Sequence, residues 1–151
     1  MVVDSRAKGA RAETAIRDRL RELTDLNWER VPSSGALDPK HGLKGDLYVP
    51  NEKNLYCVEV KHYAEDQLST SVFTAKDPIL LQWWDQSCRQ ATQVKKEILL
   101  IFKHDRSKLF CAFAHPPTGS YRMIMINTPT QQMFIALLDD WILHEDPKFI
   151  A

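Results

Sequence analysis

The sequence has no apolar run of the roughly 20 residues needed to cross a bilayer. Its first residues, MVVDSRAKGARAE, lack the apolar segment of a signal peptide, so we expect a cytoplasmic protein. Cysteine is also scarce. The three cysteines, Cys57, Cys88 and Cys111, are far apart, lie in apolar surroundings and form no metal-spaced pair. They indicate buried thiols in a reducing compartment, and they exclude a disulfide framework and a zinc site.

Several common catalytic motifs are absent as well. With only five glycines, the chain has no Gly-rich phosphate loop, and it shows no Ser/His/Asp arrangement. It has no internal repeat, low-complexity tract or interdomain linker. A length of 151 residues, 44% of them hydrophobic, predicts one globular domain over residues 1–151.

The chain carries no net charge, although nucleic-acid enzymes are usually basic. The charges are unevenly distributed. Residues 130–151 hold four acids and one lysine, which leaves 19 basic and 16 acidic groups in the rest of the chain. The charge distribution therefore permits DNA binding without arguing for it.

Hydrophobic periodicity predicts alternating helices and strands. Helices are expected at 6–24, from Asp77-Pro78 to about Lys96, and at 131–143. Strands are expected at 28–31, 45–49, 55–61, 98–102, 109–113 and 122–126. This order predicts an α/β (α+β) fold with one mixed central β-sheet flanked by helices.

A charged pair interrupts the apolar strand 55–61. Glu59 and Lys61 are two residues apart, so their side chains lie on the same face of the strand. An isolated Glu-x-Lys is common and is consistent with a surface ion pair. Asp46, at the start of the preceding strand, is equally consistent with a turn aspartate that caps a loop.

The combination is more informative than either part. The turn at 50–54 predicts a hairpin, which brings Asp46 beside Glu59 and Lys61 at one rim of the sheet. Two carboxylates that share a site are destabilised unless a cation lies between them. The natural occupant is Mg²⁺, because it prefers oxygen ligands and keeps waters that can act as nucleophile. Glu13 borders the buried stripe of the first helix, where it either joins this site or pairs with Arg17 one turn later.

Together these residues resemble the PD-(D/E)xK nuclease superfamily, and within it the archaeal-type Holliday-junction resolvases and related phage endonucleases. The resemblance covers the first 61 residues and rests on Glu13, the loop Ser33-Ser34-Gly35, Gly45-Asp46, and Glu59-Val60-Lys61. Gly45 replaces the proline that names the superfamily. The resemblance implies a restriction-endonuclease-like fold in a protein of a bacterial, archaeal or phage-infected cell. It also implies hydrolysis of DNA phosphodiesters with Mg²⁺, for which Mn²⁺ can substitute.

The resemblance further implies a role for each residue. Asp46 and Glu59 are direct metal ligands with the Val60 carbonyl as a third, and Glu13 completes the site directly or through water. Lys61 orients the attacking water and stabilises charge on the phosphate.

A serine of the preceding loop assists, and the choice between Ser33 and Ser34 stays open. Ser34 is taken as the catalytic serine and Ser33 as a DNA contact. Lys40, His41 and Lys44 either bind the DNA backbone or are solvated loop residues.

We therefore expect a magnesium-dependent endonuclease that cuts branched DNA, with a four-way junction as the leading substrate on the strength of the resemblance. A restriction-like, nicking or repair nuclease is the alternative within the fold, and a catalytically inactive DNA-binding protein is the alternative of another class. The apolar residues of 131–143 either form a homodimer interface or pack within one monomer.

Overall fold

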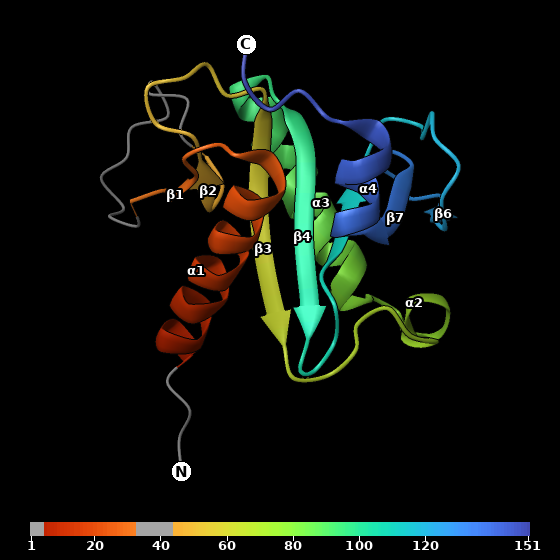
Figure 1. Cartoon of the computed structure of the whole chain (residues 1–151). Coiled ribbons are helices and arrows are strands. Elements are labelled where there is room, and N and C mark those ends of the chain that lie inside the picture. Colours follow the sequence, from red (N-terminus) through yellow and green to blue (C-terminus); the bar gives the residue numbers. More distant parts are fainter. Residues whose placement is uncertain (1–4, 33–43) are drawn as a thin grey trace.

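The computed structural model describes residues 5–32 and 44–151 (Figure 1). No helix in these two ranges is both long and apolar enough to span a membrane. In chain order the elements are α1 (Ser5–Thr24), β1 (Glu29–Arg30), β2 (Leu47–Tyr48), β3 (Tyr56–Tyr63), α2 (Ser71–Thr74), α3 (Ile79–Val94), β4 (Glu97–His104), β5 (Phe110–Phe113), β6 (Ile124–Ile126), β7 (Met133–Leu137) and α4 (Leu138–Glu145).

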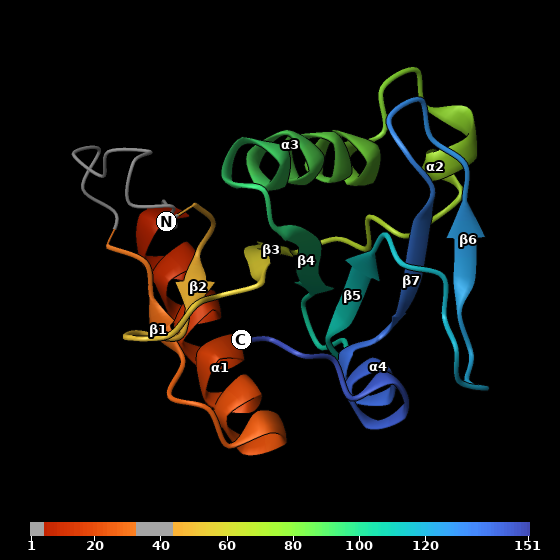
Figure 2. The same ribbon diagram turned by 90° about the horizontal axis from the view of Figure 1, so that it is seen from above.

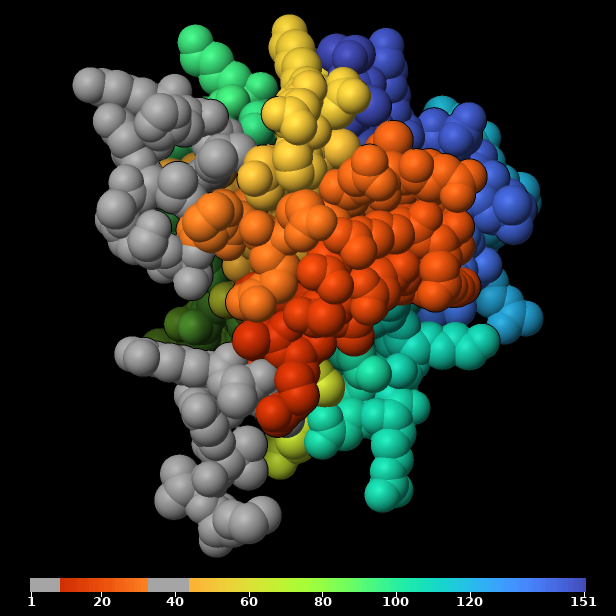
Figure 3. Space-filling view, turned by 60° about the vertical axis from the view of Figure 1, so that its left-hand side comes forward, coloured from red at the N-terminus to blue at the C-terminus, as the bar shows by residue number. Residues whose placement is uncertain are grey.

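The strands form one mixed sheet in the order β1-β2-β3-β4-β5-β7-β6. β3 and β4 are parallel along their whole length, whereas the other neighbouring strands are antiparallel. Parallel neighbours need a crossover connection, which α3 supplies. α3 covers one face of the sheet, and α1 and α4 cover the other (Figure 2). The side of α1 that faces away from the sheet is exposed on the molecular surface (Figure 3). The predicted mixed sheet flanked by helices is confirmed.

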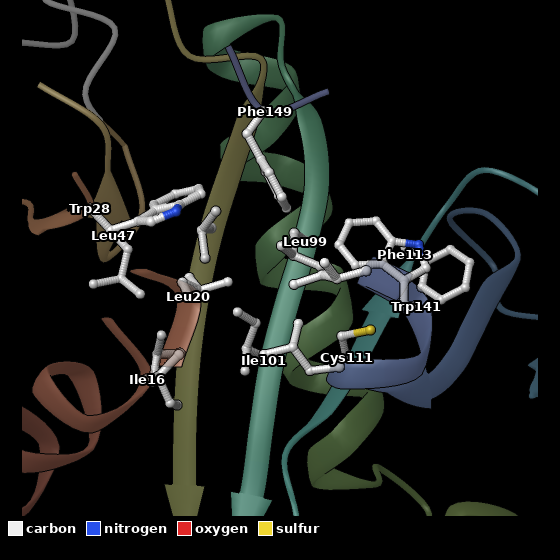
Figure 4. Close-up of a cluster of buried hydrophobic side chains, with 14 of the residues drawn as sticks. Ile16, Leu20, Trp28, Leu47, Leu99, Ile101, Cys111, Phe113, Trp141 and Phe149 are labelled. Carbon is white, nitrogen blue, oxygen red and sulfur yellow. The ribbon is translucent and has the colours of Figure 1, made fainter. Parts of the chain in front are cut away.

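Each face of the sheet has its own hydrophobic core. Leu99 and Ile101 of β4 pack with Ile16 and Leu20 of α1 (Figure 4), whereas Leu100 packs on the opposite face under α3. β4 is therefore buried on both faces, as expected for a central strand with helices on both sides. The three cysteines are buried and free, as the sequence predicts.

The helix predicted over 131–143 is wrong. This segment contains strand β7 followed by helix α4. Residues Met133, Phe134, Ile135 and Ala136 are all buried, because β7 lies between β5 and β6 with a core on each face. Such a continuous apolar run has no period that separates a buried strand from a buried helix.

The correction also removes the sequence-based reason for a dimer. Phe134, Leu138, Trp141 and Ile142 pack into the core of the single chain, and Leu143 is the one apolar side chain of this segment that is largely exposed. The apolar surface assigned to a partner therefore faces the chain's own sheet.

Candidate active site

Asp46 directly precedes β2 and is fixed by three hydrogen bonds. Its N–H donates to the Val58 carbonyl (2.7 Å), and its own carbonyl accepts from the Val31 N–H (2.8 Å). Its carboxylate Oδ2 accepts from the Val60 N–H (2.7 Å). The Asp46 carboxylate thus accepts the hydrogen bond that a backbone carbonyl of a paired strand would otherwise accept from the Val60 N–H. Beyond Val60, β3 pairs with no described strand on this side.

The close approach of the two strands depends on Gly45. Its φ is +91°, and a Cβ added there would lie 2.6 Å from the Val58 carbonyl oxygen. Proline cannot adopt this conformation, since its ring holds φ near −65°. The departure from the proline that names the superfamily is therefore a requirement of this backbone.

Glu59 and Lys61 lie on the α3 face of β3, as the alternation of the strand predicts. Glu59 is only 5% exposed, so the interpretation as a surface ion pair is wrong. Its Oε1 is buried and has no hydrogen-bond partner among the described residues. The pKa of Glu59 is raised to about 8, first by burial and then by the neighbouring Asp46 carboxylate, and the charge of Lys61 offsets only part of this rise.

The Val60 carbonyl faces the same rim as the Asp46 carboxylate. In a strand, the N–H and C=O of one residue point to the same side. Because the Val60 N–H donates to Asp46, its carbonyl points to that side too. The two carboxylates and this carbonyl are thus placed around one edge of β3.

Glu13 approaches the same edge from α1. Its Oε2 accepts a hydrogen bond from Arg30 Nε of β1 (2.9 Å). Burial raises the pKa of Glu13, and the charge of Asp46 raises it as well, so these two carboxylates are neighbours. The predicted alternative, a pair with Arg17, is wrong, because Arg17 pairs with Asp18 (3.0 Å).

Arg30 is the residue that sequence reasoning missed. It lies 17 positions from Glu13, so only the tertiary pairing of β1 with β2 brings it to the rim. The available signal was its place in the short strand predicted at 28–31, next to the strand that follows Asp46. The Arg30 guanidinium is the positively charged partner of the Glu13 carboxylate.

The remaining predicted residues divide into two groups. Ser33, Ser34, Lys40 and His41 lie outside the described residues. Lys44 is half-buried. Lys44 is two positions before Asp46, in the segment that leads into β2.

The oxygen atoms at this edge are suited to a metal site with few protein ligands, and not to a site formed by three side chains. Among residues 5–32 and 44–151, no three His, Cys, Asp or Glu side chains are gathered closely enough to hold a metal. Glu13 is held instead by Arg30. Mg²⁺, however, is usually bound by one or two carboxylates and keeps several waters. Asp46, the Glu59 oxygen without a described partner and the Val60 carbonyl supply two carboxylates and a carbonyl of this kind.

Comparison with known proteins places the chain in a nuclease family. Residues 4–140 match the family described as "Phage putative PDDEXK endonuclease", so the chain belongs to this family. The chain is similar to "Protein D14" of Escherichia phage T5, at 40% identity over 152 residues that cover 95% of each protein.

Among solved structures, it is similar to Hjc of Archaeoglobus fulgidus, a Holliday junction resolvase from an archaeal hyperthermophile. The TM-score is 0.43 and the identity 17%, over 91% of this chain and 89% of that one.

The buried Glu59 predicts a pH dependence of stability in metal-free protein. Its pKa is raised from 4.5 to about 8 in the folded chain, so folding favours the protonated form. The associated stability is complete below about pH 4.5 and is lost as the pH rises toward about 8. In metal-free buffer, the melting temperature of wild-type protein should therefore fall more steeply over this range than that of Glu59→Gln. Equal slopes for the two proteins in thermal melts would contradict the assignment.

Proposed function

We propose that this chain is a magnesium-dependent DNA endonuclease, with residues 1–151 forming one nuclease domain. The observation that carries the proposal is the placement of the Asp46 carboxylate beside Glu59, a buried carboxyl group whose Oε1 has no hydrogen-bond partner among the described residues. Like charges in so dry a place are destabilising unless a cation offsets them. Lys61, on the same strand face as Glu59, adds the positive group that phosphodiester hydrolysis needs. Membership of a PDDEXK nuclease family supports this chemistry.

Each residue has a distinct task in the proposed reaction. Asp46, Glu59 and the Val60 carbonyl would hold Mg²⁺, and Glu13 would hold one of its waters. The ion supplies a Lewis acid and a water of lowered pKa. The Lys61 ammonium would orient the attacking water and stabilise charge on the phosphate oxygens, for which its compact charge is suited.

We propose branched DNA, and a four-way junction in particular, as the substrate. The resemblance of the Glu13, Asp46 and Glu59-Val60-Lys61 pattern to archaeal-type resolvases supports this choice. The similarity to a phage protein supports action in the cytoplasm of a phage-infected cell. Preferential cutting of linear, nicked or damaged duplex would instead favour a restriction-like, nicking or repair nuclease.

DNA cleavage should require Mg²⁺ or Mn²⁺ and stop in excess EDTA, because the paired carboxylates need a cation. Ca²⁺ should support DNA binding with little cleavage, since its looser coordination positions water poorly. Gel assays with matched linear, flap and four-way-junction DNA, at fixed salt, would measure both properties. Undiminished cleavage in the chelator would remove the metal from the proposal.

Asp46→Asn and Glu59→Gln should each slow cleavage by at least about two orders of magnitude, the scale of losing one transition-state contact. Lys61→Ala should slow cleavage similarly while leaving metal binding intact, because lysine is not a ligand. Glu13→Gln should have a smaller effect. Single-turnover rates on the preferred DNA, with Mn²⁺ binding measured in parallel, would separate these roles.

Glu52→Gln is a matched control, because Glu52 is an exposed carboxylate in the turn between the same two strands. It should cleave at the wild-type rate. DNA binding with no cleavage by the wild-type protein under any metal would favour the catalytically inactive alternative. A near-wild-type rate for Asp46→Asn or Glu59→Gln would show that the site is wrongly assigned.

A homodimer remains part of the proposal for a functional reason. Resolving a four-way junction takes two symmetric cuts, which a two-fold dimer can supply. Light scattering should then report about twice the 17.4 kDa chain mass, at least on junction DNA. A monomer both free and bound to a junction would contradict the dimer, and would favour a nicking or repair nuclease.

A further inference from the structure

The last residue of β3 exposes an aromatic ring beside the candidate active site. Tyr63 is 44% exposed and lies on the α3 face, the same strand face as Glu59 and Lys61. Exposure increases along this face, from 1% at Cys57 and 5% at Glu59 to a half-buried Lys61. The strand thus emerges from under α3 into solvent where Tyr63 stands.

The ring of Tyr63 is held in place from the protein side. It packs edge to face with Trp83 of α3, at 5.0 Å between ring centroids and 83° between planes. Trp83 is only 6% exposed and packs in turn against Phe102 of β4. The Tyr63 hydroxyl makes no hydrogen bond among the described residues. A ring that is held by Trp83 and is exposed to solvent can stack with the ring of a ligand.

The position of Tyr63 relates it to the DNA that Lys61 is proposed to contact. Two residues of a strand span about 6.6 Å. Bases along one DNA strand are spaced about 3.4 Å apart. Tyr63 therefore lies within about one or two nucleotides of the phosphate at Lys61. On this side β3 pairs with no described strand beyond Val60.

We infer that Tyr63 forms a nucleobase subsite, on which an unpaired base next to the scissile phosphate stacks. This inference rests on the proposed function and names the substrate feature that the site would recognise. Stacking on an aromatic side chain tolerates any base, because every base has a π face. The bases that can reach such a ring are the unstacked ones of gaps, flaps and branch points. The subsite thus favours DNA interrupted at the cut over continuous duplex.

A binding experiment with altered bases tests the subsite directly. The DNA is a duplex with a short single-stranded gap, and abasic nucleotides replace the gap nucleotides one at a time. Binding is measured in Ca²⁺ for wild-type protein, Tyr63→Phe and Tyr63→Leu. Wild type and Tyr63→Phe should lose about tenfold in affinity at one or two abasic positions next to the cut. Tyr63→Leu should bind intact gapped DNA about tenfold more weakly and lose nothing further at those positions.

Phe73→Leu is the matched control, because Phe73 of α2 is an 84% exposed aromatic outside β3. It should bind as wild type does. The melting temperature and Mn²⁺ binding of Tyr63→Leu should stay unchanged, whereas a purely structural role of the ring would lower the melting temperature.

Three results would overturn the subsite: wild-type affinity for Tyr63→Leu, equal losses for Phe73→Leu, or abasic effects that persist in Tyr63→Leu. If the wild-type protein cleaves DNA with Mg²⁺ and one of these results is found, the subsite alone fails. If it binds no DNA at all, the proposed function fails with it.

Discussion

The hydrogen bond from the Val60 N–H to the Asp46 carboxylate is the interaction on which the geometry of the site depends. Asp46 continues the β2–β3 ladder with its own N–H, then ends the ladder with its side chain. The pairing strand stops there, while β3 continues toward Tyr63. One residue therefore fixes the end of the β2–β3 pairing and brings a carboxylate beside Glu59.

Two ionised carboxylates in this arrangement would repel each other, and without a cation the pKa of Glu59 is raised so that its protonated form is favoured. Glu59 is buried between Val58 and Val60, whose side chains pack in the core beneath α1. β3 cannot move to relieve the repulsion, because it is paired with β4 along its whole length. The pairing of β3 with β4 and the core beneath α1 thus fix Glu59 beside Asp46. Violations of local burial logic of this kind are expected at functional sites.

Local patterns predicted the parts of the site that depend on local structure. The two-residue period of a strand is sufficient to place Glu59 and Lys61 on one face, and a hairpin turn is sufficient to bring Asp46 beside them. Arg30 could not be predicted in the same way, since its contact with Glu13 depends on how α1 packs against β1. Strand β7 was missed because Met133–Ala136 is apolar on both sides, so it has neither a strand period nor a helix period.

The increase in exposure along β3 relates catalysis to recognition. A buried carboxylate cannot contact the substrate directly, but it can bind a metal ion, which is the role proposed for Glu59. A group that contacts phosphate must be more accessible, and Lys61 is half-buried. A group that meets a base must be the most accessible, and Tyr63 stands last. Because same-face residues of a strand are about 6.6 Å apart, the order of exposure along β3 is also an order in space, from the proposed metal ligand to the proposed phosphate contact to the proposed base contact. In the proposed function, the strand that carries the proposed metal ligand would therefore also determine how far from the cut a base is recognised.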